Sequence, residues 1–358
     1  MSQNPRWYQK IYTYIWIFNT GRGLSVCIRL PHNIGVLYDL GASDEFSPAA
    51  FIAENIAPHL TRYSGCAIAQ CFLSHPHADH ISEIDAISGD ANKSKLYPWF
   101  LTCPNDKVAG ESVDFDRILN NDNRELIGKY RSTYAQRTPP LQTIQNIGPC
   151  RVPNVEYGFY YLVPPKVNCI HSTNDQHYGN GLSLVFYLRH GSQSILIPGD
   201  ITPDVLDLVL EGQTGVVKRF SVFGQSETHG DWHSSTSTQP TLRDLLADHG
   251  LSVLIAPHHG LESCFSRKLF EAMRGGKPMI NVISEKRHLS ESDGKVDNRY
   301  QNEAGASGIK VDIDGYIDSN RRSVSTRDGH HILLVFQGTN LTPRVYLRKN
   351  PLDLLQIV

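Results

Sequence analysis

Residues 74–80 read Ser74-His75-Pro76-His77-Ala78-Asp79-His80, a His-x-His-x-Asp-His signature. Three imidazoles and one carboxylate within six positions form a dense set of nitrogen and oxygen ligands for a divalent metal ion. The apolar run at 67–73 predicts a buried strand before the motif, and the apolar spacing at 81–87 predicts a helix after it. The motif therefore lies at a strand-to-helix turn, where its side chains can converge. Histidines that only cap the helix are the alternative interpretation.

The composition is that of an ordinary globular protein. The chain has 358 residues, of which 40% are hydrophobic and 20% are charged, so it can bury a large core. We predict a single domain over residues 1–358. No apolar run approaches the ~20 residues that a membrane span needs, and residues 1–6 lack the apolar core of a signal peptide. We therefore expect a cytoplasmic protein that has no membrane partner.

Cysteine usage and net charge restrict the partners further. The seven cysteines are scattered and never form a Cys-x-x-Cys pair, which favours reduced thiols over a disulfide framework or a structural zinc knuckle. The formal net charge is −2, so long-range attraction to nucleic acid is not built into the whole molecule. A polyanion would have to be held by local patches and by the metal itself.

Hydrophobic patterning predicts an α/β protein. Strands are expected at 11–18, 24–30, 36–39, 182–188, 194–198, 252–256, 279–284, 310–317 and 331–337, and helices at 48–60, 204–212, 241–249 and 266–274. Residues 104–165 show no strand alternation at their start and are rich in Asn, Asp, Arg and Pro. We predict that they form a helical insertion within the domain.

Three further segments place metal-binding side chains at the ends of predicted strands. Asp39 follows the strand that begins at Val36, Asp200 follows Gly199, and the pair His258–His259 precedes a glycine. In each case a turn-forming residue lets the backbone bend, so that the side chain can project from the sheet edge. Each signal is weak alone, because such residues are often turn formers or helix caps. Their order along the chain is specific.

That ordered set resembles the metallo-β-lactamase fold superfamily, and most closely the nuclease-like domain of the ComEC competence proteins and their stand-alone soluble relatives. The resemblance covers residues 20 to about 290. It is carried by the segments Gly21-Arg22-Gly23-Leu24-Ser25, Tyr38-Asp39-Leu40-Gly41, Ser74 to His80, Asn180-Gly181-Leu182-Ser183-Leu184-Val185, Pro198-Gly199-Asp200 and Pro257-His258-His259-Gly260.

The resemblance implies a four-layer αββα sandwich with two divalent metal ions, Zn or Mn, at one sheet edge. It assigns the first metal to His75 and His77, and the second to Asp79, His80 and His258. Asp200 would bridge the two ions, and Asp39 would support the ligands from behind. Neutral imidazoles suit zinc or manganese, and a shared carboxylate neutralises two nearby cations.

One departure from the family pattern concerns the first metal. Many members supply a third histidine just ahead of the strand that here begins at Leu182, but this chain has Asn180 at that place. Either Asn180 completes a weaker first site, or His177 substitutes for the missing histidine, or the site fills only with substrate present. An oxygen-richer first site would favour manganese over zinc.

The ComEC-like features predict a nuclease or phosphodiesterase that cleaves DNA or RNA with a water activated by two metal ions. Asp79 would orient the nucleophile, and His259 would contact a phosphate oxygen or protonate the leaving group, unless His259 only packs behind the ligands. Candidate substrate contacts are Lys286, Arg287 and His177. The soluble relatives suggest a role in DNA processing or bacterial defence.

Two other functions stay open at this stage. The same metal pair could hydrolyse a small molecule such as a cyclic nucleotide, a lactone or a lactam, and the near-neutral charge favours that possibility. Alternatively, the chain could be a non-catalytic subunit with a structural metal site, whose insertion at 104–165 binds a partner protein.

Overall fold

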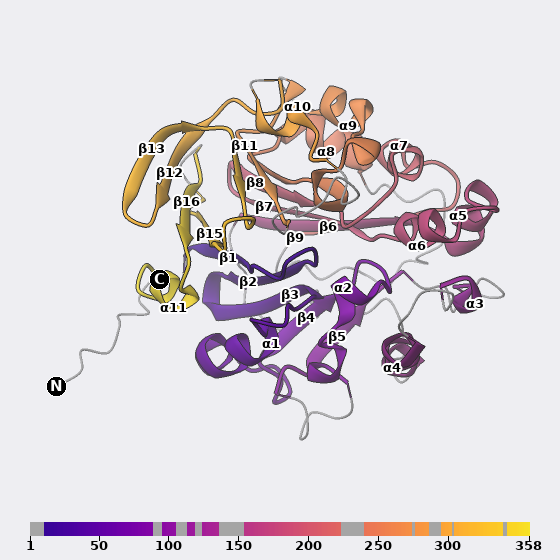
Figure 1. Ribbon diagram of the computed structural model, residues 1–358, viewed down its shortest axis with the longest axis horizontal. Coiled ribbons are helices and arrows are strands. Elements are labelled where there is room, and N and C mark those ends of the chain that lie inside the picture. Colours follow the sequence, from indigo (N-terminus) through magenta and orange to yellow (C-terminus); the bar gives the residue numbers. More distant parts are fainter. Residues whose placement is uncertain are drawn as a thin grey trace.

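The computed structural model describes residues 11–88, 95–104, 113–118, 124–135, 154–222, 240–273, 276–285, 295–302, 304–338 and 342–358. Over these ranges the chain is a mixed α/β protein built on one sheet of nine strands and one of seven. Figure 1 shows the two sheets one above the other, with helices on the outer side of each.

The nine-stranded sheet has the order β13-β12-β16-β15-β1-β2-β3-β4-β5. Its strands are β1 (Thr13–Ile17), β2 (Ser25–Leu30), β3 (Ile34–Leu40), β4 (Ile68–Phe72), β5 (Pro98–Thr102), β12 (Ile309–Ile313), β13 (Tyr316–Arg321), β15 (His331–Phe336) and β16 (Arg344–Arg348). Strands β3, β4 and β5 run parallel, whereas β1 pairs antiparallel with both β2 and β15. The first and last thirds of the chain therefore meet in one sheet.

The seven-stranded sheet has the order β14-β11-β10-β8-β7-β6-β9. Its strands are β6 (Val155–Leu162), β7 (Val185–His190), β8 (Gln193–Ile197), β9 (Val216–Val222), β10 (Val253–Ile255), β11 (Ile280–Ile283) and β14 (Ser323–Ser325). Strands β8, β10, β11 and β14 run parallel. Their carboxyl ends consequently lie at one edge of the sheet, where turns can bring side chains together.

Both faces of each sheet are largely apolar and covered, except at the edge of the nine-stranded sheet, where β13 is mostly exposed. Alternate residues such as Ile28, Phe72 and Phe186 point between the sheets into one shared core. The opposite residues of the seven-stranded sheet pack against one group of helices, and those of the nine-stranded sheet pack against another. Burial of this kind stabilises a fold by about 25 cal/mol per Å² of apolar surface.

The described helices are short, and some of them end at ordinary stop signals. They are α1 (Pro48–Phe51), α2 (Ala78–Ile81), α3 (Phe115–Ile118), α4 (Arg124–Ala135), α5 (Pro164–Ile170), α6 (Asp175–Gly181), α7 (Pro203–Glu211), α8 (Leu242–His249), α9 (Arg267–Ala272), α10 (Asn298–Gln301) and α11 (Pro351–Leu355). For example, α7 begins with proline at its first position and ends at Gly212, whose φ is 59°. Within the described part of the chain, none of these helices has the length and apolar character required to cross a bilayer.

The helical insertion predicted at 104–165 is only partly helical. Its described residues include α3 and α4, but residues 155–162 form β6, which lies between β7 and β9 in the seven-stranded sheet. The prediction is wrong for that strand because β6 is buried on both faces, so it lacks the alternation of polar and apolar residues that would reveal it. The helix predicted at 48–60 is also interrupted, since α1 gives way to a π-helical turn at Ile52–Ile56.

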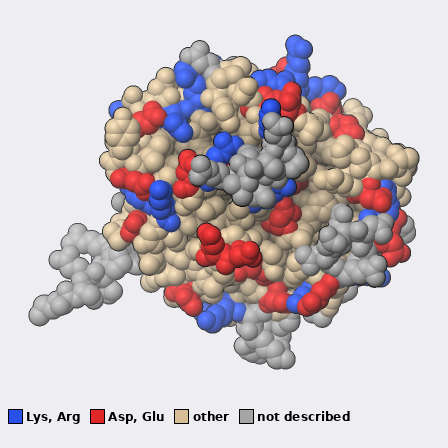
Figure 2. All heavy atoms as spheres, in the orientation of Figure 1, with Lys and Arg blue, Asp and Glu red and all other residues tan. Residues whose placement is uncertain are grey.

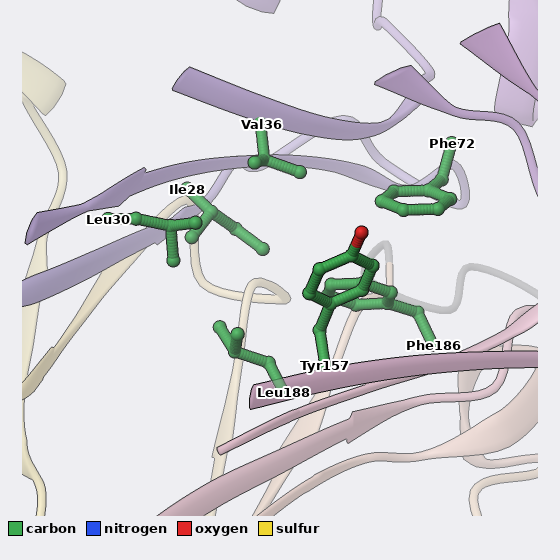
Figure 3. Close-up of a pocket in the computed structure, with 7 residues that line it drawn as sticks. All are labelled: Ile28, Leu30, Val36, Phe72, Tyr157, Phe186 and Leu188. Atoms are coloured by element: carbon green, nitrogen blue, oxygen red, sulfur yellow. The ribbon is translucent and has the colours of Figure 1, made fainter. Parts of the chain in front are cut away.

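The core between the sheets contains a small apolar cavity of about 10 Å³ (Figure 3). It is lined by Ile28, Leu30, Val36, Phe72, Tyr157, Phe186 and Leu188. Its side chains come from both sheets, and Figure 3 shows Val36 and Phe72 facing Tyr157 and Phe186 across the gap. The volume corresponds to about one water molecule at most.

Candidate metal centre

The candidate ligands lie at the ends of β3, β4, β8 and β10. Asp39 is the penultimate residue of β3, residues 74–80 follow β4, and Asp200 follows β8. Gly199 has a φ of 61°, and a Cβ atom there would lie 2.9 Å from the Cβ of Ser74. Glycine therefore allows the turn after β8 to approach the histidine motif. After β10, the residues 258–259 adopt left-handed φ values of 47° and 59°, which direct two consecutive rings towards the same centre.

Four side chains form a cluster that could hold a metal ion. They are Asp79, His80, Asp200 and His259, each with one ligand atom, and these atoms lie within 4.8 Å of one another. His80 Nε2 is 3.3 Å from Asp200 Oδ1, and His259 Nε2 is 3.6 Å from both Asp79 Oδ2 and Asp200 Oδ2. Two nitrogen and two carboxylate donors match the preferences of zinc and manganese.

Hydrogen bonds fix the orientation of both histidines in this cluster. His80 Nδ1 lies 2.7 Å from Asp39 Oδ2, and His259 Nδ1 lies 2.8 Å from the Ser284 carbonyl oxygen. Because these oxygens accept, each Nδ1 carries a hydrogen, and in the neutral ring each Nε2 would offer its lone pair to a cation. His80 Nε2 is buried without a hydrogen-bond partner, as expected for an atom that binds a cation.

His75 and His77 form a second pair beside the cluster. The Ser74 hydroxyl donates to Asp39 Oδ2, so its oxygen accepts from His75 Nδ1 at 2.9 Å. The other ring nitrogen, His75 Nε2, lies 3.1 Å from His77 Nδ1. Two nitrogens that share one metal at ~2.1 Å lie about 3.0–3.4 Å apart. The spacing therefore fits a single cation bound by both rings.

His258 lies beside the four-membered cluster and is not one of its members. Sequence reasoning made His258 a metal ligand and gave His259 a contact with a phosphate oxygen, a proton donation or a packing role. In the structure His259 belongs to the group that could hold a metal ion, and the role of each histidine stays a prediction. His258 Nε2 is 3.6 Å from Asp200 Oδ2, while its Nδ1 is 3.0 Å from Cys264 Sγ and 3.4 Å from Asn180 Nδ2. Asn180 is thus brought to the centre, in contact with His258.

Of the three predicted substrate contacts, only His177 lies among the described residues. His177 is exposed on α6, and its ring packs edge-on against His171 with 5.6 Å between centroids. Lys286 and Arg287 lie outside the described residues. Their proposed contact with a polyanion stays a prediction.

Burial and opposite charges shift the pKa values of the cluster in different directions. Burial alone would lower the pKa of His80, but three neighbouring carboxylates outweigh it and raise that pKa well above its ordinary value. Burial would raise the pKa of Asp200, yet the surrounding histidines hold it well below the usual range. Burial, reinforced by the other imidazoles, lowers the pKa of His75 well below its ordinary value. His75 is therefore neutral, as a metal ligand must be.

Sequence reasoning missed several residues that orient the ligands. Ser74 and Ser183 both contact His75 Nδ1, and the Ser183 hydroxyl also accepts from the Asp200 N–H. The Ser284 carbonyl orients His259. Ser74 directly precedes the histidine motif and could have been found from that position. A backbone carbonyl such as that of Ser284 leaves no mark in a sequence.

The donors present fit a divalent metal. Nitrogen and carboxylate ligands converge, the Nδ1 atoms of His75, His80 and His259 are hydrogen-bonded to oxygen atoms, and the buried Nε2 of His80 has no hydrogen-bond partner. In comparisons with known proteins, no family model matches this chain, and no curated protein shows significant similarity to it. The interpretation of the centre therefore depends on its geometry.

Proposed function

We propose that this protein is a metal-dependent hydrolase with a metallo-β-lactamase-type four-layer αββα sandwich, and that it cleaves phosphodiester bonds in DNA or RNA. The core shared by the two sheets and the helices on both outer faces support the fold. The observation that carries the function is the convergence of Asp79, His80, Asp200 and His259 from three distant strand ends.

Two divalent ions would occupy the centre in this proposal. His75 and His77 would hold the first, the four-residue cluster would hold the second, and Asp200 would be shared. When bound, the ions would polarise a phosphate group and lower the pKa of a water molecule, which supplies a nucleophile near neutral pH. Either zinc or manganese suits these donors.

The protein's own side chains then position the reactants. The Asp79 side chain is 39% exposed, whereas Asp200 is 5% exposed and His80 is fully buried. Asp79 therefore faces the side from which substrate arrives, where its carboxylate can accept a hydrogen bond from the attacking water and orient it. Asp200 and His80 remain behind it as fixed donors to the metal.

The ComEC-like motifs favour nucleic acid as the substrate. A small phosphodiester such as a cyclic nucleotide is the second candidate, because the formal net charge is −2 and Lys/Arg and Asp/Glu groups are interspersed on the face shown in Figure 2. A protein that binds long nucleic acids usually carries a basic surface. The substrate test therefore includes both classes.

To test this, the purified protein is incubated with Mn²⁺ or Zn²⁺ and with each substrate in turn. The substrates are plasmid DNA, single-stranded DNA, RNA, bis-nitrophenyl phosphate and a cyclic dinucleotide. We expect metal-dependent cleavage of nucleic acid that falls by about 10²-fold or more in Asp79→Asn. The control variant Asp44→Asn changes an exposed carboxylate outside the cluster and should keep full activity. Cleavage that survives in Asp79→Asn would come from a contaminant and contradict the proposal. Cleavage of only the small esters would support the second candidate.

A further inference from the structure

We propose that His258 supplies the third nitrogen of the first metal site, in place of a histidine at position 180, and that Asn180 and Cys264 hold its ring in position. The inference rests on the proposed function, since it assigns a ligand within the two-metal centre. It begins from an unfilled coordination position. Beside the shared Asp200, the first site has only the two nitrogens of His75 and His77, three protein donors in all, whereas a four-coordinate site has room for one more.

The position of the His258 ring fits this role. His258 Nε2 and His259 Nε2 are each 3.6 Å from the same atom, Asp200 Oδ2. These distances allow one carboxylate oxygen to be shared by two ions, each with its own histidine. Because His259 already belongs to the cluster of the second ion, His258 is left for the first.

The neighbours of His258 connect it to the first pair of histidines. Asn180 contacts the His258 ring, and the residue before it, Gly179, lies so close to His77 that a Cβ atom would be 2.2 Å from His77 Nε2. His77 and His258 therefore flank one short segment of α6.

A single amide rotation gives His258 the tautomer that a ligand needs. Asn180 Oδ1 is buried without a partner, whereas Nδ2 lies 3.4 Å from His258 Nδ1. Oxygen and nitrogen of an amide are interchangeable by rotation. With Oδ1 in that place, the orphaned oxygen accepts a hydrogen bond from His258 Nδ1–H, and the Nε2 lone pair points towards Asp200 and the first ion.

Metal stoichiometry in paired variants tests the assignment without measuring activity. Metal content after dialysis and calorimetric titration with Zn²⁺ or Mn²⁺ should give two ions for the wild type and one for His258→Gln, His75→Ala or His259→Gln. Because His75 and His258 would serve the same ion, the double variant His75→Ala/His258→Gln should still bind one. The double variant His258→Gln/His259→Gln should bind none.

The outcomes separate this inference from the proposed function. If the wild type binds two ions and His258→Gln keeps both with unchanged affinity, the inference is wrong and the two-metal centre stands. If His75→Ala/His258→Gln binds none and His258→Gln/His259→Gln binds one, His258 belongs to the second ion and the inference is also wrong. A wild type that binds a single ion would contradict both proposals.

Variants at position 180 supply a matched control. Asn180→Asp keeps an acceptor for His258 Nδ1–H and should bind the first ion at least as tightly as the wild type. Asn180→Leu removes the acceptor while keeping a similar side-chain volume, and it should weaken the binding of the first ion by about 10–100-fold. Equal affinities in the Leu and Asp variants would overturn the role given to Asn180. Unfolding midpoints identify any variant that fails to fold.

Discussion

At the scale of single residues, Asp39 connects both halves of the centre. Its carboxylate accepts from the Ser74 N–H at 2.6 Å, from the Ser74 hydroxyl at 2.7 Å and from His80 Nδ1 at 2.7 Å. Because the Ser74 hydroxyl is committed to Asp39, its oxygen is available to His75 Nδ1–H. One buried carboxylate therefore orients a proposed ligand of each metal ion.

We expect Asp39→Asn to weaken the binding of both ions by about 10–100-fold. An asparagine oxygen can replace one acceptor, but the amide NH₂ would face the Ser74 or His80 donors, so at least one ligand ring loses its anchor. Calorimetric titration with Zn²⁺ or Mn²⁺ measures the change, and the exposed variant Asp44→Asn serves as the control. A folded Asp39→Asn protein with wild-type affinities would contradict the prediction.

The sequence indicates the metal-binding segments but not the role of each histidine. Residues 74–80 are distinctive because their donors are adjacent in the chain. His258 and His259 are adjacent too, and both could be ligands. What distinguishes them is the Ser284 carbonyl, which accepts from His259 Nδ1, and the pair Asn180 and Cys264, which contacts His258. These partners come from distant elements, so no local pattern predicts them.

At the scale of elements, strands are predictable where their apolar runs are clear. The strands expected at 24–30 and 194–198 correspond to β2 and β8. Strand β6 escapes prediction because aromatic residues face both the shared core and the outer helices, as Phe159 and Tyr160 do. Its place beside β7 and β9 is determined by tertiary packing rather than by local preference.

The cavity between the sheets leads to a prediction about packing. Val36 of β3 lines it, so Val36→Ile should place one extra methylene group in unfilled space and raise the free energy of unfolding by about 0.8 kcal/mol. Val26→Ile is the matched control, because Val26 is buried in the same core but does not line the cavity. In Val26→Ile the added methylene group should lower the free energy of unfolding by about 1–3 kcal/mol. Urea denaturation measures both, and destabilisation of Val36→Ile would contradict the prediction.

At the scale of the whole molecule, polar contacts supplement the apolar core that joins the sheets. The hydroxyl of Thr13 in β1 is hydrogen-bonded to His190 Nδ1 in β7, at 3.0 Å, and so links one sheet to the other. His331 of β15 accepts from the Asn19 N–H and packs against aromatic rings. The pairing of β15 with β1 joins segments more than 300 residues apart, and no pattern in the sequence specifies that register.

Acid should destabilise the protein through these two histidines. Burial lowers the pKa of both His190 and His331 to about 4, whereas in the unfolded chain the value is about 6.5. Below pH 6.5 the unfolded state therefore binds protons that the folded state does not, and stability falls until the pH reaches about 4, below which these groups cause no further loss. Between pH 7 and pH 5, each of the two histidines should lower the free energy of unfolding by about 2 kcal/mol.

The variant His190→Asn keeps a hydrogen-bonding group for Thr13 but does not titrate. Urea denaturation should therefore show that its free energy of unfolding falls by about 2 kcal/mol less than that of the wild type over this pH range. Parallel losses in the two proteins would mean that His190 is protonated as readily in the folded state as in the unfolded state.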